Sequence, residues 1–225
     1  MSIYGHALDN SIVREGYIFD SKNIEYQVDE FKQGKVKTLF VTGMSGSGKS
    51  TLAHKLEKEL GINCYELDDI GTNYNFSDDN LKEYGQEIYD WFNGPGKDFR
   101  IQPSEKGKKH NWSYIYACSE FIKYILSKNA RCIVEGIHIF LCLDNKLLKI
   151  EQFEHSAMII MGTSAIKSTV RALSRDYKND KKEDPNLKLK DAIPFKYLVS
   201  RIKEALQDEK TLKKLREKYK KKESQ

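Results

Sequence analysis

Short apolar runs alternate with amphipathic stretches along the middle of this chain. Residues 36–42, 62–67, 131–134 and 157–161 are rich in β-branched and other apolar residues, and they predict buried strands. Residues 50–60 place Leu52, Leu56 and Leu60 on one face of a helix, and residues 112–127 repeat that helical spacing. Strands that alternate with helices predict an α/β protein whose parallel sheet carries helices on both faces.

Three stretches depart from this alternation. Residues 1–35 are polar with scattered aromatic residues, and alternation at residues 17–19 and 24–28 predicts short strands in an N-terminal extension to which we assign no role. Residues 71–111, which contain Gly94-Pro95-Gly96, predict an insertion, and insertions at the mouth of an α/β sheet often form substrate lids. Residues 178–225 predict a basic, mostly helical C-terminal segment. The core therefore spans residues 36–177.

The basic charge of the chain is concentrated at its C-terminal end. The net charge is +5, but residues 178–225 hold 16 Lys plus Arg against 9 Asp plus Glu. Such a segment is able to contact RNA or another phosphate-rich ligand, yet mixed charge runs are more typical of a solvated helix face. We therefore favour the solvated face over nucleic-acid binding.

Nothing in the sequence predicts export or membrane insertion. No apolar run approaches the ~20 residues that span a bilayer, and residues 1–10 lack the basic start and apolar core of a signal peptide. The cysteines form no C-x-x-C pair, and they predict buried thiols rather than a zinc or redox site. They are Cys64, Cys118, Cys132 and Cys142. We expect a cytoplasmic protein with no membrane partner.

The segment between the first predicted strand and the first predicted helix is rich in glycine. It reads Gly43-Met44-Ser45-Gly46-Ser47-Gly48-Lys49-Ser50 and matches G-x-x-x-x-G-K-[ST] at each fixed position. The glycines let successive backbone N–H groups turn toward phosphate oxygens, and the helix N-terminus adds a positive dipole end. We expect Lys49 to reach the β- and γ-phosphates, Ser50 to ligate Mg²⁺, and Thr51 to complete the binding segment. Residues 43–50, the glycine loop, therefore predict a nucleoside triphosphate, ATP or GTP, bound with Mg²⁺.

Acidic residues follow two of the predicted strands. Asp68 and Asp69 come after the second strand and Glu135 after the third. Ligands of open α/β sheets bind outside the carboxyl ends of the strands, so all three are expected there. One carboxylate can accept the proton of an acceptor hydroxyl while another anchors Mg²⁺, and either aspartate suits the role of base. We place Ser50, Asp69 and Glu135 in the metal site; the structural alternatives are a helix cap at Asp68-Asp69 and a lysine ion pair at Glu135.

Together these motifs resemble the P-loop small-molecule kinases. Leu67-Asp68-Asp69 follows the glycine loop, and Val134-Glu135-Gly136-Ile137-His138 and Arg175-Asp176 are similar to the uridine kinase and phosphoribulokinase branch. The resemblance extends from residue 36 to about residue 177. It implies the three-layer sandwich of P-loop NTPases with a five-stranded parallel core, an ATP donor, a catalytic aspartate after the second strand and a lid with arginines. It gives the base role to Asp68 or Asp69, the acceptor or Mg²⁺ role to Glu135, and the lid role to Arg171 and Arg175.

Arg171 and Arg175 stand four positions apart after the fourth strand, so a helix there projects them from one face. Guanidinium groups pair with phosphate oxygens in a bidentate way and neutralise charge on a transferring phosphoryl group. The alternative is an exposed helix with salt links between side chains four residues apart. Beyond Asp176 the sequence shows neither a clear fifth apolar strand nor an adenine-binding segment.

Aromatic residues are concentrated between the second and third predicted strands, where the resembling family places acceptor contacts. They are Tyr74, Phe76, Tyr84, Tyr89, Trp91, Phe92 and Phe99, with Arg100 beside them. A nucleobase can stack on such residues, but packing among themselves is the commoner arrangement. His138 has the same two interpretations, a substrate contact or a structural role.

Three classes of function fit these features. The favoured one is an ATP-dependent kinase that transfers the γ-phosphoryl group to a small acceptor, a nucleoside, nucleotide or sugar hydroxyl. A nucleotide hydrolase or switch is less favoured, because Asn145-Lys146-Leu147-Leu148 lacks the Asp of the guanine-reading Asn-Lys-x-Asp motif. A polynucleotide-end or toxin-like kinase would use the basic C-terminal segment as its electrostatic footprint.

Overall fold

The structure is a computed structural model that describes residues 21–72, 81–82, 85–99, 114–153, 156–162, 164–189 and 193–223. Its main elements are α3 (Ser21–Lys32), β1 (Thr38–Gly43), α4 (Lys49–Leu60), β2 (Cys64–Glu66), α5 (Leu67–Thr72), α7 (Gln86–Phe92), η1 (Lys97–Phe99), α8 (Tyr114–Lys128), β3 (Cys132–Glu135), α9 (His138–Asp144), η3 (Ile150–Phe153), β4 (Ala157–Met161), α10 (Ala165–Glu183) and α12 (Phe195–Glu223). They fall into two compact units: a sheet unit within Lys22–Thr42 and Ser50–Ile159, and a helical unit within Gly43–Lys49 and Ile160–Gln225.

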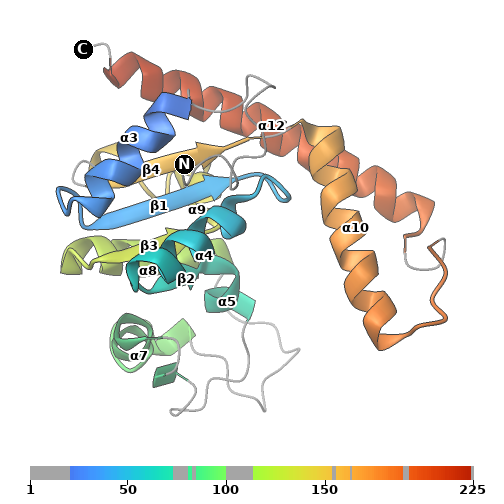
Figure 1. Ribbon diagram of the computed structural model, residues 1–225, viewed down its shortest axis with the longest axis horizontal. Helices are drawn as coiled ribbons and strands as arrows, with labels where there is room; N and C mark the ends of the chain where they lie inside the picture. The colour runs from blue at the N-terminus through green and yellow to red at the C-terminus, as the bar shows by residue number, and fades with distance from the viewer. Residues whose placement is uncertain are drawn as a thin grey trace. The chain divides into compact units, whose positions relative to one another are not determined.

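A parallel sheet of four strands in the order β2-β3-β1-β4 organises the fold (Figure 1). Within it, β3 lies between β1 and β2, with Glu135 level with both Val41 and Glu66. Because parallel strands run in the same direction, these residues meet at one carboxyl edge. The predicted α/β fold of the P-loop NTPase type is confirmed. The resemblance implies five strands, and the described residues form four.

The apolar runs of the sequence form the core of the sheet unit. Every residue of β1 and β3 is buried, which explains why the apolar residues of these strands are consecutive rather than alternating. On α4, Leu52 and Leu56 are buried, as the four-residue spacing predicts. The strands predicted at residues 36–42, 131–134 and 157–161 and the helices predicted at residues 50–60 and 112–127 are all present, with ends shifted by a few residues.

Two local predictions need correction. Residues 24–28 were expected to form a short strand, but they lie within the helix α3, which buries Val28 and Phe31 three positions apart on one face. The predicted alternation at residues 17–19 lies outside the described residues. Asp68 and Asp69 were expected directly after a strand through residue 67, but β2 ends at Glu66 and both aspartates stand in the first turn of α5. That position favours acidic side chains because of the positive helix end.

The described part of the insertion at residues 71–111 contains α7 and η1. Trp91 and Phe92 are buried, and Trp91 stacks on Phe99 with a ring distance of 5.7 Å while meeting Phe121 of α8 edge to face. Packing, the commoner interpretation, thus accounts for these three aromatic residues of the stretch. Four others that the sequence singled out lie outside the described residues: Tyr74, Phe76, Tyr84 and Arg100.

The helical unit is built from α10 and α12, which pack against each other (Figure 1). Ser164 caps α10 by accepting a hydrogen bond from the Lys167 N–H, and Glu209 of α12 accepts one from the Ala165 N–H. The buried residues of α10 end at Leu173, and residues 178–183 at its C-terminal end are exposed. The domain boundary predicted after residue 177 falls inside this helix.

Three of the four cysteines lie in the interior of the protein. Cys118, Cys132 and Cys142 are buried free thiols and Cys64 is half-buried, in agreement with the sequence. Burial raises the pKa of the Cys118 and Cys132 thiols, which keeps them protonated and unreactive. Among the described residues, no helix is long and apolar enough to cross a membrane.

Candidate functional site

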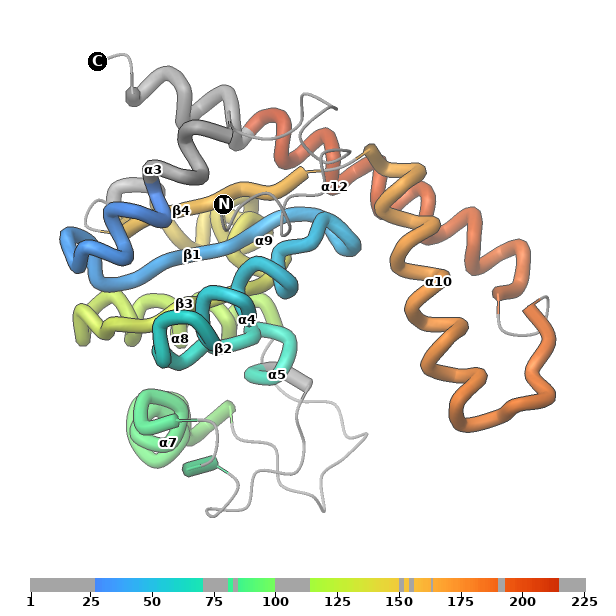
Figure 2. Tube along the Cα trace, viewed as in Figure 1, coloured from blue at the N-terminus to red at the C-terminus, as the bar shows by residue number. Residues whose placement is uncertain are grey.

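The glycine loop connects β1 to α4, and Lys49 is the first residue of that helix (Figure 2). The backbone of the loop depends on Gly46, where φ is +71° and where an added Cβ would lie 3.0 Å from the Arg171 Cβ. Both the backbone angle and the space therefore select glycine. Met44 is buried and donates its N–H to the Met161 carbonyl oxygen at 3.3 Å, which ties the loop to the end of β4. The strand, loop and helix arrangement predicted from the sequence is confirmed.

Helix α10 holds the glycine loop by two side chains. The Ser168 hydroxyl donates a hydrogen bond to the Ser45 carbonyl oxygen, and Arg171 Nη1 donates one to the Gly46 carbonyl oxygen at 3.2 Å. The hydroxyl of Ser47 is buried and has no hydrogen-bond partner among the described residues. A buried hydroxyl in a loop of this sequence suits a phosphate oxygen as its partner. Arg171 thus lies beside the loop, and its role in a lid stays a prediction.

In the sheet unit, a side-chain hydrogen bond joins Ser50 to Glu135. The Ser50 hydroxyl donates to Glu135 Oε1 at 2.9 Å, although the two residues are 85 positions apart in the sequence. Glu135 is 2% exposed at the end of β3, where pairing with β1 and β2 fixes its position. The parallel sheet thereby brings the last residue of the glycine loop to a buried carboxylate.

These two oxygen donors fit Mg²⁺. Hard cations of this size prefer carboxylate and hydroxyl oxygen, and in phosphate-transferring sites Mg²⁺ keeps several waters and takes one or two protein ligands besides the phosphates. No group of three or more His, Cys, Asp or Glu side chains among the described residues is arranged to hold a metal by itself. Ser50 and Glu135 therefore offer two of the oxygen ligands that Mg²⁺ takes when it binds together with phosphates.

Asp68 lies beside His138, with Asp68 Oδ1 and His138 Nδ1 3.2 Å apart. The imidazole is largely buried against the ring of Tyr114, at a ring distance of 4.3 Å, whereas Asp68 is exposed. Tyr114 also donates its hydroxyl to the Leu67 carbonyl oxygen at 2.6 Å, next to Asp68 in the chain. The contact meets the distance of an ion pair without the alignment of a hydrogen bond. One aspartate of the predicted pair thus lies next to a largely buried imidazole.

Gly136 permits this arrangement. An added Cβ at Gly136, where φ is +155°, would lie 2.9 Å from the Leu67 Cβ. The close approach of these two backbones brings the segment after β3 against the start of α5. His138 stands two residues after Gly136 and Asp68 directly after Leu67, so the same approach brings these two side chains together. We call Asp68, Asp69, Glu135 and His138 the acidic edge.

Asp69 has different surroundings from Asp68. Burial raises the pKa of the Asp69 carboxyl above its ordinary value, and the neighbouring carboxylates of Glu66 and Asp68 raise it further. His54, whose Nε2 lies 2.7 Å from Glu66 Oε1, acts in the other direction and lowers the pKa of the Asp69 carboxyl. The two adjacent aspartates therefore differ in exposure and in partners.

The remaining predicted residues are spread over α4 and α10. Lys49 is 9% exposed at the start of α4, and Thr51 is exposed one residue beyond Ser50. Arg171 and Arg175 do lie on one helix, but Arg175 is exposed and its nearest ion pair is with the adjacent Asp176, at 3.3 Å. The sequence does not predict the contacts of Ser168 and Tyr114, because their partners are 123 and 47 positions away in the chain and no local motif marks them.

Comparison with known families gives one match. Residues 35–80 match the model of the family described as adenylylsulphate kinase, a range that begins before β1 and includes the glycine loop, α4, β2 and α5. No curated protein and no solved structure matches the chain. Adenylylsulphate kinase is a P-loop kinase family, so the match supports an enzyme of the P-loop kinase class, in which ATP, Mg²⁺ and a small-molecule acceptor are the general reactants.

Proposed function

We propose that this protein is an ATP-dependent kinase that transfers the γ-phosphoryl group to a hydroxyl of a small acceptor, a nucleoside, nucleotide or sugar. The observation that carries the proposal is the hydrogen bond between Ser50 and Glu135. It connects the phosphate-binding motif with a buried carboxylate at the edge of the sheet where ligands of α/β proteins collect. The resemblance of residues 134–138 to the uridine kinase branch supports the choice of a hydroxyl acceptor.

The glycine loop binds the donor phosphates in this proposal. Backbone N–H groups of residues 43–50 and the Ser47 hydroxyl contact phosphate oxygens, and the Lys49 ammonium neutralises the β- and γ-phosphates. Arg171, already at the loop, and Arg175, one turn further along α10, close on the transferring group. The arginines act most strongly as charge develops in the transition state, because their planar groups make two hydrogen bonds to one phosphate.

Ser50 and Glu135 hold Mg²⁺ in this proposal, with Asp69 contributing through water. Bound there, the ion would neutralise charge on the β- and γ-phosphates. Glu135 keeps the Ser50 hydroxyl oriented by accepting a hydrogen bond from it, with 2.9 Å between the two oxygens. A carboxylate that is 2% exposed pays a desolvation cost that a cation relieves, which favours Mg²⁺ over a purely structural role.

Asp68 serves as the general base that removes the proton of the acceptor hydroxyl. It is the more exposed aspartate, and His138 lies 3.2 Å from it on a buried, fixed ring. Asp69 suits that role less well, because it is half-buried beside Glu66 and is less accessible to an acceptor than Asp68. The imidazole of His138 limits the rotation of the Asp68 carboxylate and so orients it for proton transfer.

A guanine-dependent switch finds less support. Asn145, the residue that would begin a base-reading motif, ends α9 and donates its side-chain amide to the Leu141 carbonyl oxygen at 2.8 Å. Its side chain therefore has a local capping role that accounts for its presence in the sequence.

An acceptor screen tests the proposal. Purified protein with ATP and Mg²⁺ is given nucleosides, nucleoside monophosphates, sugars and short RNA, and ADP release is measured above the rate without acceptor. We expect one class to raise ADP release and to appear as a phosphorylated product by mass spectrometry, with Lys49→Ala as the inactive control. ADP release at the same rate with and without every acceptor would identify a hydrolase instead.

A further inference from the structure

Helix α10 separates its charges by sign. It carries six basic and three acidic residues, and all nineteen residues of the helix are described. At about 100° per residue, five of the basic side chains fall within an arc of about 80°, which we call the cationic stripe. They are Lys167, Arg171, Arg175, Lys178 and Lys182. The acidic residues Asp176, Asp180 and Glu183 lie on the opposite side of the helix.

This separation is unusual for a helix face that only meets water. Within α10, no basic residue stands three or four positions from an acidic one, and Arg175 pairs with the adjacent Asp176 instead. Lys167, Arg171 and Arg175 are instead like-charged neighbours four apart, an arrangement that destabilises an isolated helix. Lysines in the last turn favour the helix dipole, but that effect does not reach Arg175 or Lys178. The stripe therefore has a cost that a bound anion would offset.

Helix α12 of the same unit carries ion pairs at helical spacing, although Lys210 and Lys214 on it also stand four positions apart. Arg201 Nη1 lies 2.9 Å from Glu204 Oε2, and Lys213 Nζ lies 3.0 Å from Glu209 Oε1, at spacings of three and four residues. Such interleaved pairs fit the solvated face that we favoured for the basic C-terminal segment. The cationic stripe begins at residue 167, before that segment, so the interpretation of residues 178–225 as a solvated face does not account for it.

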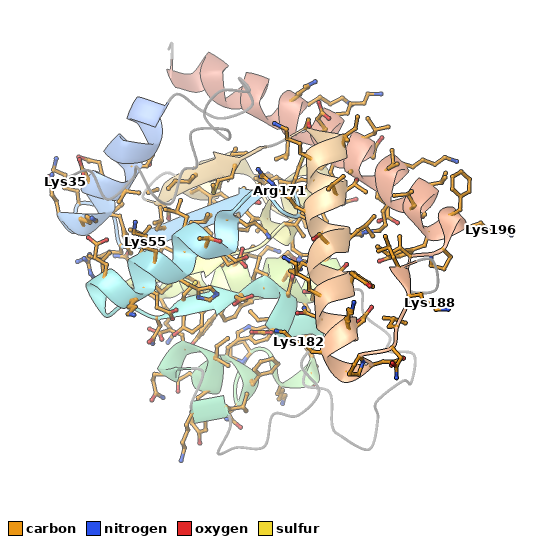
Figure 3. The ribbon with its side chains drawn as sticks, turned by 45° about the vertical axis from the view of Figure 1, so that its right-hand side comes forward. Lys35, Lys55, Arg171, Lys182, Lys188 and Lys196 are labelled. Carbon is orange, nitrogen blue, oxygen red and sulfur yellow. The ribbon has the colours of Figure 1, made fainter. Side chains whose placement is uncertain are left out.

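The stripe starts at the glycine loop and runs away from it along an exposed helix. Arg171 contacts the Gly46 carbonyl oxygen at 3.2 Å, and Lys178 and Lys182 lie beyond the last buried residue of α10. Figure 3 labels Arg171 and Lys182 on this helix, with Lys188 in the following turn and Lys196 on α12. From residue 167 to residue 182 the stripe is about 22 Å long at 1.5 Å per residue. That length matches about six phosphates at the axial rise of about 3.4 Å per phosphate of one strand in a stacked helix, and fewer if the strand is extended.

We propose that the cationic stripe of α10 binds the phosphate backbone of a polynucleotide whose terminal hydroxyl is the acceptor. The inference rests on the proposed phosphoryl transfer and extends its acceptor from a free nucleoside or nucleotide to the end of a strand. A strand that ends at the glycine loop places consecutive phosphates along the stripe. Inorganic polyphosphate has the same repeating charge, but it offers no hydroxyl to phosphorylate. No aromatic residue lies on the stripe itself, so we expect contact with the backbone and little sequence preference.

Salt-dependent binding tests the stripe without requiring activity. The probe is a single-stranded oligonucleotide of RNA about twelve nucleotides long, twice the stripe, with a fluorophore at its 3′ end and a free 5′ hydroxyl. If five cations contact phosphates, the logarithm of the binding constant should fall against the logarithm of salt with a slope of about −3.5. Lys178→Gln with Lys182→Gln removes two of those charges and should reduce the slope to about −2.1.

A matched pair of lysines controls for net charge. Lys188→Gln with Lys196→Gln removes the same charge from exposed positions off the stripe and should leave the slope near −3.5. Lys178→Arg with Lys182→Arg keeps the charges and should also keep the slope, which separates lost charge from a damaged helix. An equal change of slope in both glutamine pairs, or no change in either, would overturn the proposal. So would stripe-dependent binding of inorganic polyphosphate that exceeds RNA binding at equal numbers of phosphates.

Product analysis separates this inference from the kinase proposal. With ATP and Mg²⁺, the oligonucleotide should gain one phosphate at its terminal hydroxyl, and the lysine-to-glutamine pair on the stripe should raise its KM while leaving ADP release with a free nucleoside unchanged. Stripe-dependent binding without transfer to any acceptor would remove the kinase proposal alone. Transfer to a free nucleoside by a protein that does not bind the oligonucleotide would remove the stripe proposal alone.

Discussion

The glycine loop and the acidic edge are both polar, but they are assembled in different ways. The loop is a single run of eight residues whose roles follow from their order in the sequence. The acidic edge joins residues 68–69 to residues 135–138, and its contacts exist only because β2 and β3 pair in parallel. A contiguous motif thus specifies its own geometry, whereas the pairing of the strands determines which residues meet in a dispersed site. We expect the two regions to control different kinetic steps.

The largest expected effect belongs to the glycine loop. Lys49→Ala removes the ammonium that neutralises the β- and γ-phosphates, so turnover should fall by about 10³-fold or more. The melting temperature should change little if the lysine serves only the ligand, and a thermal melt run beside the ADP-release assay checks this. Near wild-type turnover in Lys49→Ala would show that the loop does not carry the reaction.

The acidic edge should affect the chemical step without weakening the donor. Asp68→Asn removes the proposed base and should lower kcat by about 10²-fold with the KM for ATP nearly unchanged. Asp69→Asn should instead raise the Mg²⁺ concentration required for half-maximal activity, because its proposed role is with the metal. Full progress curves over a Mg²⁺ titration distinguish the two variants. Equal and mild effects would support the alternative that both aspartates merely stabilise the first turn of α5.

How far the sequence predicts the site depends on the distance between partners. The strand, the glycine loop and α4 follow from local pattern, and so do Arg171 and Arg175 on one helix. The strand predicted at residues 24–28 is wrong, because a short alternating run cannot be told from a helix that buries Val28 and Phe31. The bonds from Ser50 to Glu135 and from Ser168 to Ser45 join residues 85 and 123 positions apart, and no single-sequence pattern encodes such pairs.

Gly136 offers a way to disturb the acidic edge while the loop stays intact. In Gly136→Ala the new methyl group would meet the Leu67 Cβ at 2.9 Å, so the start of α5 must shift. We expect a loss of about 1–3 kcal/mol in the free energy of unfolding, and a fall in kcat from the displaced Asp68. Gly61→Ala is the matched control, because Gly61 also has a positive φ, +61°, but nothing lies within 4 Å of its added Cβ. An equal loss in both variants would mean that backbone strain alone explains the glycine.

Arg175 tests the proposed lid role of α10 in the helical unit. Arg175→Ala should reduce kcat by about tenfold and ATP affinity less, since guanidinium contacts mature as charge develops. Arg175→Lys should recover only part of the loss, because an ammonium cannot make the paired hydrogen bonds. Both variants are measured at saturating Mg²⁺. Full activity of Arg175→Lys would reduce Arg175 to its exposed ion pair with Asp176, which tolerates lysine.

The smallest expected effect is that of Tyr114→Phe. The hydroxyl of Tyr114 donates to the Leu67 carbonyl oxygen at 2.6 Å, while its ring packs against His138, and phenylalanine keeps the ring and loses only the hydrogen bond. The loss should be about 1 kcal/mol in the free energy of unfolding, measured by urea denaturation. Because Leu67 precedes Asp68, a few-fold fall in kcat should accompany it, with the KM for ATP unchanged. Tyr124→Phe, further along α8, controls for loss of a hydroxyl from the same helix. If Tyr114→Phe raised the KM for ATP instead, the hydroxyl would serve donor binding, and the division of labour between the glycine loop and the acidic edge would be wrong.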